Sequence, residues 1–225
     1  MIRTPDGEDE TTIARDIAIG PLALPGELVL PDGASALIVF AHGSGSSRLS
    51  PRNRAVAHAL NERGVATLLF DLLRPEEERD RTNVFDIPLL AGRLIDAVHW
   101  IDWQEDLANI PIGLFGASTG AAAALVAAAS LGKRIGAVVS RGGRPDLAAQ
   151  ALERVSAPTL LIVGGLDDEV IALNEEALAH LRCTKALEIV PGATHLFPEP
   201  GTLARVIDLA GAWFDTHLAS DRTQG

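Results

Sequence analysis

The sequence predicts an α/β fold in which helices cover both faces of a mostly parallel, twisted sheet. Short apolar runs alternate with helical patterns through most of the chain, as expected of successive strand–helix–strand units. A chain of 225 residues with 47% hydrophobic content can also bury one sizeable core. We therefore expect a single domain over residues 1–225, with the polar ends, residues 1–12 and 219–225, as loose tails.

The first expected elements form an antiparallel hairpin at the edge of the sheet. The apolar segments Ile13–Ile19 and Leu24–Leu30 are separated by Pro21 and Pro25. Pro31-Asp32-Gly33 follows the second segment, and this combination is typical of a turn.

Six buried strands and six helices are expected after the hairpin. The strands are Leu37–Phe40, Ala66–Phe70, Ile112–Phe115, Ala137–Ser140, Thr159–Val163 and Leu187–Val190. The helices are Asn53–Glu62, Pro88–Trp103, Gly120–Ser130, Pro145–Arg154, Asn174–Leu181 and Leu203–Leu218. The alanine run at residues 121–129 indicates a thin helix that packs closely on the sheet.

The loops after the six strands define where a site should form. Ligands of such sheets bind at the carboxyl ends of the strands. These loops begin at Ala41, Asp71, Gly116, Arg141, Gly164 and Pro191. Every candidate residue below comes from one of them, so the candidates should gather on one face.

The strongest motif is Gly116-Ala117-Ser118-Thr119-Gly120, which lies between an apolar run and the alanine-rich helix. A G-x-S-x-G sequence in this context indicates a sharp strand-to-helix turn that exposes a nucleophilic serine. The glycines leave room for so tight a turn. The alternative is that Ser118 is an ordinary helix N-cap.

A serine nucleophile needs a base, and the base needs an orienting acid. His195 is the expected base because it lies directly after the last strand, whereas His180 and His217 fall within helical patterns. The acid should follow the preceding strand, where Asp167 and Asp168 are adjacent. Spacing does not decide between them; we favour Asp167, and the alternative is that both cap the next helix.

The oxyanion of the reaction needs fixed N–H donors. The backbone N–H groups of Thr119 and Ser44 are the expected donors, since Ser44 lies in the glycine-rich loop after the first parallel strand. His42 precedes this loop, and we interpret it as a structural residue that hydrogen-bonds the loop rather than as a base.

Arginines gather at the same loops although the chain is acidic. Arg48, Arg52 and Arg54 follow the glycine-rich loop, and Arg141 and Arg144 follow another strand. Arginine suits bidentate binding of carboxylate or phosphate, so Arg48 and Arg141 are candidate substrate-binding residues for an anionic ester. The alternative is that these side chains pair with local acids such as Asp146 or face solvent.

Other classes of site and partner are not supported. The net charge of −11 argues against nucleic-acid and anionic-membrane binding, and no apolar run reaches the ~20 residues of a membrane span. Gly43-Ser44-Gly45 lacks the third glycine of a dinucleotide-binding motif, and Gly132-Lys133-Arg134 lacks the rest of a phosphate-binding P-loop. The sequence also contains no cluster of metal ligands. We expect no cofactor and no metal. The acidic N-terminus is no secretory signal and Cys183 is the single cysteine, so a cytoplasmic location is the default.

Four motifs together resemble the α/β-hydrolase superfamily, and within it the small dienelactone-hydrolase-like members. They are His42-Gly43-Ser44-Gly45, Gly116-Ala117-Ser118-Thr119-Gly120, Gly165-Leu166-Asp167 with Val170, and Gly192-Ala193-Thr194-His195. The resemblance spans about residues 28–218. It implies hydrolysis of carboxylic esters through an acyl-enzyme on Ser118, His195 and Asp167. One position departs from the pattern: dienelactone hydrolases proper use a cysteine nucleophile, and position 118 is serine.

The expected activity is hydrolysis of small esters or lactones at an open site. Only residues 141–158 connect two strands where many relatives insert a lid domain, so no lid is expected. A thioesterase or small-peptide hydrolase would use the same residues. A binding protein that keeps the fold without catalysis is the alternative from another class. The sequence does not indicate an oligomeric state.

Overall fold

Eight strands form one sheet in the computed structural model, which describes residues 12–218. The predicted tails therefore lie outside the described residues, apart from Thr12. The strand order is β1-β2-β4-β3-β5-β6-β7-β8. The strands are β1 (Ile13–Ile19), β2 (Leu24–Leu30), β3 (Leu37–Ala41), β4 (Ala66–Phe70), β5 (Ile112–Ala117), β6 (Ile135–Arg141), β7 (Thr159–Gly164) and β8 (Lys185–Val190).

The N-terminal hairpin lies at the edge of this sheet, as predicted. β1 pairs with β2 in antiparallel register, and β2 joins the remaining strands through an antiparallel pairing with β4. The pairings from β4 across to β8 are parallel. The carboxyl ends of six strands therefore point to one end of the molecule, where the candidate residues lie.

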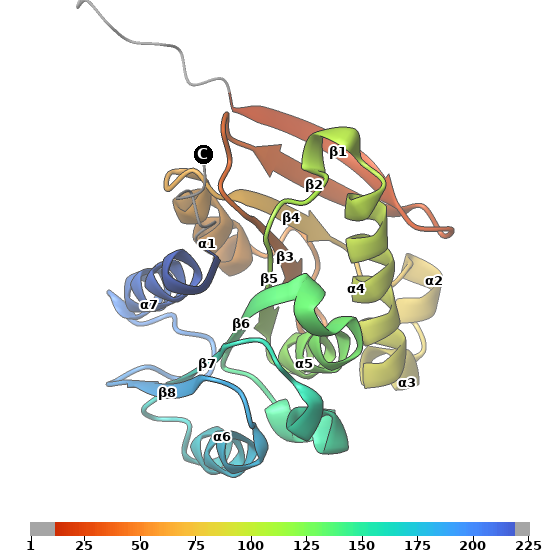
Figure 1. Cartoon of the computed structure of the whole chain (residues 1–225). Helices are drawn as coiled ribbons and strands as arrows, with labels where there is room; N and C mark the ends of the chain where they lie inside the picture. Colours follow the sequence, from red (N-terminus) through yellow and green to blue (C-terminus); the bar gives the residue numbers. More distant parts are fainter. Residues whose placement is uncertain (1–11, 219–225) are drawn as a thin grey trace, which may run out of the picture.

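Helices cover both faces of the sheet (Figure 1). The helices α1 (Pro51–Asn61) and α7 (Thr202–Leu218) pack on one face. The helices α4 (Ile87–Asp102), α5 (Thr119–Leu131) and α6 (Asp168–His180) cover the other. Each face has its own apolar core, which confirms the predicted α/β fold.

The helix α5 can pack closely on the sheet because six of its nine buried residues are alanine. A Cβ on Gly120 would collide with the carbonyl oxygens of Ala41 and His42, and one on Gly116 would collide with the backbone of Ala121. These two glycines of the serine motif therefore allow the start of α5 to approach β3 and β5.

Three local details differ from the sequence prediction. The segment Pro145–Arg154 forms the 3-10 helix η3 rather than an α-helix, because Ala149 adopts φ 46° and ψ −128° and interrupts it. α6 begins at Asp168 instead of Asn174, and two short helices, α2 (Pro75–Glu78) and α3 (Arg81–Val84), were not predicted. Asp168 and Glu169 in the first turn of α6 favour the earlier start through the helix dipole.

The connection from β6 to β7 contains only η3, so no lid domain is inserted there.

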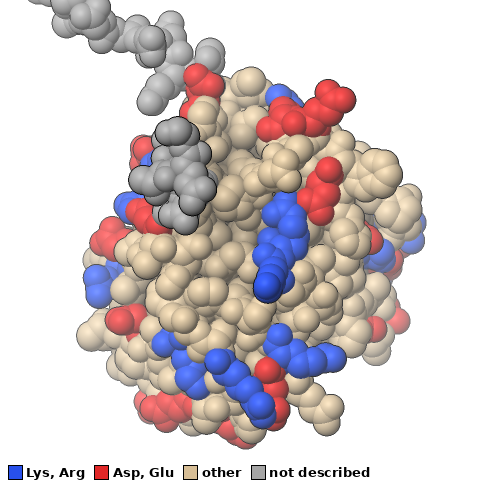
Figure 2. All heavy atoms as spheres, in the orientation of Figure 1, with Lys and Arg blue, Asp and Glu red and all other residues tan. Residues whose placement is uncertain are grey.

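Basic and acidic side chains are interspersed in small groups over the face shown in Figure 2. Within residues 12–218, no helix has the length and apolar character needed to cross a bilayer.

Candidate active site

Ser118 lies on the tight turn between β5 and α5 with φ 51° and ψ −123°. This backbone conformation is rare and strained for a residue with a side chain. It is held from both sides, because the Ser118 N–H donates to the Arg141 carbonyl at 3.3 Å and the Ser118 carbonyl accepts from Ala121 N–H at 3.1 Å. Gly43 approaches so closely that a Cβ there would lie 2.9 Å from the Ser118 Cβ.

His195 and Asp167 form a hydrogen-bonded pair after β8 and β7. The His195 Nδ1–H donates to Asp167 Oδ2 at 2.7 Å, which leaves Nε2 as the nitrogen that can accept a proton. Asp167 occupies the N-cap position of α6, yet its side chain does not cap the helix. Asp168 is exposed in the first turn of α6. The structure therefore places Asp167, and not its neighbour, against the histidine.

Ser118 and His195 line the same cavity of about 370 Å³, together with the glycine-rich loop after β3. The loop after β6 passes against the histidine, since a Cβ on Gly142 would lie 3.7 Å from His195 Cε1. No hydrogen bond joins the Ser118 hydroxyl to the imidazole in this structure. Catalytic hydrogen bonds often tighten only when substrate is bound.

Ser44 lines this cavity and contacts Thr119, the other expected oxyanion donor. The Ser44 N–H donates to the Thr119 hydroxyl at 3.0 Å. In this structure the Ser44 donor is therefore directed at a neutral oxygen of the protein. The N–H of Thr119 lies in the first turn of α5, where helical N–H groups lack intrahelical partners.

His42 has the structural role that the sequence indicated. Its Nε2 accepts from the Leu72 N–H at 3.1 Å, so the ring proton is on Nδ1, which donates to the Gly43 carbonyl at 3.0 Å. Burial lowers the pKa of His42, although the Gly43 carbonyl and the nearby Asp71 and Glu78 carboxylates oppose this effect. His42 thus remains neutral and ties the glycine-rich loop to the end of β4.

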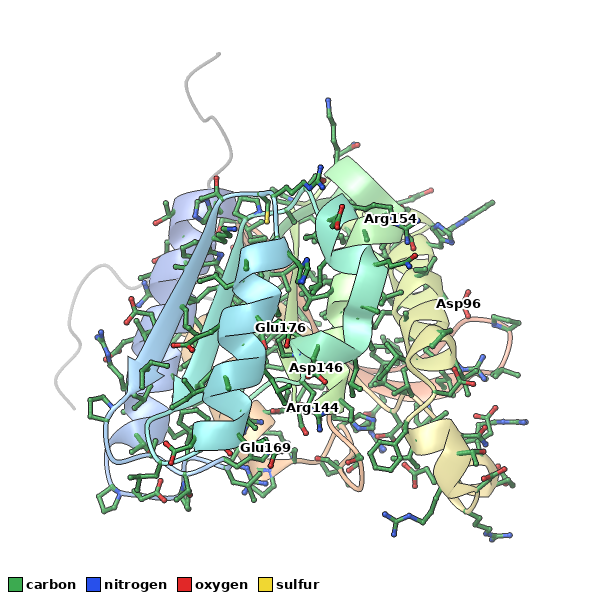
Figure 3. All side chains as sticks on the ribbon, turned by 90° about the horizontal axis from the view of Figure 1, so that it is seen from below. Asp96, Arg144, Asp146, Arg154, Glu169 and Glu176 are labelled. Atoms are coloured by element: carbon green, nitrogen blue, oxygen red, sulfur yellow. The ribbon has the colours of Figure 1, made fainter. Side chains whose placement is uncertain are left out.

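Three of the five arginines are paired with acids. Arg48 binds Asp71 at 2.6 Å, so this candidate is engaged by a carboxylate and does not line the cavity with Ser118. Arg144 binds Asp146 at 2.8 Å, beside the start of α6 (Figure 3), and this bond raises the pKa of Arg144. Arg54 lies 3.7 Å from Glu27 at the surface.

Arg141 and Arg52 differ from the other three, because both line the cavity with Ser118 and His195. Arg141 is only 5% exposed, and its Nη2 donates to Asn53 Oδ1 at 3.1 Å. Burial and the nearby Arg52 lower the pKa of Arg141 to about 10. The sequence placed Arg48 and Arg52 in one cluster and gave no signal of which side chain would face the cavity.

A second, smaller cavity of about 150 Å³ adjoins the first and shares the glycine-rich loop residues 43–46 with it, and Thr119 lines this second cavity. Its apolar wall consists of Leu72, Leu73, Val84 and Leu90, which come from the end of β4, α3 and α4. These residues were missed by the sequence interpretation because they read as core positions and because α3 was not predicted.

Known proteins share this architecture. A family model for the alpha/beta hydrolase domain matches residues 34–203. The solved structure of dienelactone hydrolase from Anabaena variabilis is 53% identical, with a TM-score of 0.89 over 93% of this chain and 99% of that one. Est1E from Butyrivibrio proteoclasticus is 17% identical with a TM-score of 0.76 over 92% and 99% of the two chains, a likeness of fold.

A Mycobacterium tuberculosis protein, provisionally named a phosphoribosyl transferase, is 57% identical over 209 residues. The match covers 93% of this chain and 47% of that protein. The chain thus spans about half the length of this curated relative. The name was given to the longer protein, whereas the family match lies within the residues described above. On this match and the observed fold, the chain belongs to the alpha/beta hydrolase domain family.

Proposed function

We propose that the protein is a serine hydrolase that cleaves small carboxylic esters or lactones through an acyl-enzyme intermediate. The observation that carries this proposal is the shared cavity of Ser118, on its strained turn, and the His195–Asp167 pair. Membership of the hydrolase family and the likeness to a solved dienelactone hydrolase support it.

The first half of the reaction forms the acyl-enzyme. The Ser118 hydroxyl attacks the acyl carbon while its proton passes to His195 Nε2. Asp167 holds the ring through its 2.7 Å hydrogen bond to Nδ1 and stabilises the imidazolium. The tetrahedral intermediate collapses, and His195 returns the proton to the departing alkoxide, which leaves as the alcohol.

The second half repeats these steps with water. His195 takes a proton from water, which attacks the Ser118 ester, and the acid product leaves as the serine hydroxyl regains its proton. Both tetrahedral intermediates need donors for their oxyanion. We assign the Thr119 and Ser44 N–H groups to this role; rotation of the Thr119 hydroxyl frees the Ser44 N–H for an oxyanion, which is the stronger acceptor.

The dimensions of the site favour small substrates. The reactive cavity of about 370 Å³ adjoins an apolar cavity of about 150 Å³, and no lid domain is inserted between β6 and β7. A short acyl or alcohol group would fit the apolar wall of Leu72, Leu73, Val84 and Leu90. A thioester or a small peptide would engage the same catalytic groups, and a binding protein without catalysis would keep the same fold.

Hydrolysis of short p-nitrophenyl esters by matched serine variants tests this function. Ser118→Ala should lower kcat by at least ~10³-fold, because the nucleophile is lost. Ser130→Ala is the control, since Ser130 lies near the far end of the same helix and its hydroxyl donates to the Val126 carbonyl. Equal activity in all three proteins would refute the serine mechanism, and absence of turnover by the wild type across acyl lengths and thioesters would favour a binding role.

A further inference from the structure

We propose that the cavity beside Ser118 contains an anion-binding subsite, formed by Arg141, Arg52 and the N-terminus of α1. It would bind a carboxylate or phosphate group carried by the substrate within a few bonds of the scissile carbonyl. The role of this subsite in catalysis rests on the proposed hydrolase function. Binding of the anion itself can be measured separately.

Arg141 is built into the support of the nucleophile. It pairs with Ala117 in the β5–β6 register, and its carbonyl accepts the Ser118 N–H. Its guanidinium is almost completely buried, and within residues 12–218 only the Asn53 amide oxygen accepts a hydrogen bond from it. Its Nε is buried and has no hydrogen-bond partner in that part of the chain. Burying a guanidinium whose N–H groups lack acceptors costs folding free energy. A bound anion would supply those acceptors.

Arg52 adds a second positive charge to the same cavity. Its Nε is likewise buried without a hydrogen-bond partner among the described residues. The two guanidiniums are close enough for Arg52 to lower the pKa of Arg141, and neither forms an ion pair within residues 12–218. Two like charges in one cavity repel each other, and an anion between them would reverse this penalty.

The first turn of α1 reinforces the positive potential. This helix of 11 residues begins at Pro51, and Ser50, Arg52 and Asn53 from its start all line the cavity. The N-terminal end of a helix carries a partial positive charge that favours anions. Two guanidiniums, one helix terminus and the uncharged Ser50 and Asn53 therefore face the same space.

The contrast with the paired arginines strengthens the assignment. Arg48, Arg54 and Arg144 each have a carboxylate within 4 Å, in a chain with 30 acidic and 19 basic residues. Acidic partners are thus available along the same loops, yet none of the described residues that line the cavity is acidic. The positive charge in this cavity is left for a ligand rather than balanced by the fold.

The planar fork of arginine selects the chemistry of the ligand. Guanidinium binds carboxylate and phosphate oxygens through two parallel hydrogen bonds, which a neutral amide cannot match. Because the Arg141 carbonyl accepts the Ser118 N–H and both residues line one cavity, an anion held by Arg141 would lie near the reacting carbonyl. The substrate class is therefore an ester or lactone that bears a carboxylate or phosphate group near the bond that is broken.

Matched pairs of esters test this subsite during turnover. Monomethyl succinate is compared with methyl succinamate, and O-acetylglycolate with 2-acetoxyacetamide, so that the charge lies on the acyl or the alcohol side. Methyl 3-phosphonopropanoate, which carries a phosphonate in place of the carboxylate, tests for recognition of a phosphate-like group. In wild type we expect kcat/KM for at least one anionic ester to exceed that of its neutral partner at least ~10-fold. Preference for the phosphonate or for a carboxylate identifies the group that is bound.

Two arginine variants and one control complete the experiment. Arg52→Met and Arg141→Met should bring the anionic-to-neutral ratio to within about threefold of one, whereas the surface variant Arg54→Met should keep the wild-type ratio. Arg52→Met tests the subsite at a second residue, which lies outside the strand that supports the Ser118 turn. Ratios near one in wild type, or a preference that survives both cavity substitutions, would overturn the subsite.

Binding without turnover separates this proposal from the hydrolase function. Thermal shift with succinate and inorganic phosphate is measured on Ser118→Ala, with and without Arg52→Met. Stabilisation that disappears with Arg52→Met supports the subsite even if the wild type hydrolyses no ester. No stabilisation by either anion, together with unchanged hydrolysis of neutral esters, would remove the subsite and leave the hydrolase proposal standing.

Discussion

The carbonyl oxygen of Arg141 accepts the backbone N–H of Ser118 at 3.3 Å, while the Arg141 guanidinium is buried beside the same cavity that Ser118 lines. One residue at the end of β6 therefore supports the strained turn of the candidate nucleophile and also supplies a charge next to it. The same residue therefore connects the geometry of the proposed reaction with the proposed preference for anionic substrates.

The Asp167–His195 hydrogen bond predicts a large difference between two adjacent aspartates. Asp167→Asn should lower kcat by about 10²–10⁴-fold, because the amide favours the wrong histidine tautomer and does not stabilise the imidazolium. Asp168→Asn, one residue away and exposed, should stay within about twofold of wild type. Steady-state ester hydrolysis checks both variants. Similar losses in both would contradict the assignment of Asp167.

His42 predicts a loss of stability in acid. Its folded pKa lies below the ordinary value of 6.5, so the unfolded chain binds more protons and the contribution of His42 is fully present above pH 6.5. That contribution is lost as the pH falls through the lowered folded pKa, since a protonated ring cannot accept the Leu72 N–H. Thermal melts from pH 8 to pH 5 should show a shallower decline for His42→Asn than for wild type. Parallel declines would show that His42 does not carry this effect.

Two glycines on helices predict opposite changes of stability. Gly120→Ala should lower the free energy of unfolding by about 3 kcal/mol or more, because the new Cβ meets the Ala41 and His42 carbonyl oxygens. Gly92→Ala within α4 should raise it by about 0.5–1 kcal/mol, because nothing lies within 4 Å of its Cβ and alanine favours the helix. Urea denaturation measures both changes. A Gly120→Ala protein as stable as wild type would contradict the close packing of α5.

Arg141 and Arg48 also predict different effects on stability. Arg48→Met leaves the mostly buried Asp71 carboxylate without its partner and should cost about 1–3 kcal/mol. Arg141→Met removes a buried charge that no carboxylate balances, so we expect no loss of stability and a gain of up to ~2 kcal/mol. Chemical denaturation without added anions compares them. A larger loss for Arg141→Met would indicate that its charge supports the fold itself.

Much of the fold followed from local pattern. The hairpin and the six later strands were located within about two residues, because buried apolar runs between turn residues identify strands well. The candidate residues could be placed on one face for the same reason, since the carboxyl ends of parallel strands meet. The kink at Ala149 could not be predicted, because nothing in an alanine-containing helical pattern signals a positive φ.

The side-chain partners in the site needed the structure. Asp167 and Asp168 are chemically equal in the sequence, and only the direction of the chain at the start of α6 sets Asp167 against His195. The sequence analysis named Arg48 rather than Arg52 as a substrate-binding candidate, whereas the structure pairs Arg48 with Asp71 and places Arg52 at the cavity. Loop composition indicates which side chains gather, whereas the pairing among them depends on packing between segments far apart in the chain.

The role of Ser118 as nucleophile is tested most directly by the position of a covalent adduct after treatment with a fluorophosphonate probe. The native protein is labelled, digested and analysed by tandem mass spectrometry. We predict one modified residue, Ser118, and strongly slowed labelling in His195→Ala. An adduct on another residue, or no adduct under conditions in which known serine hydrolases react, would contradict the claim that Ser118 is the nucleophile.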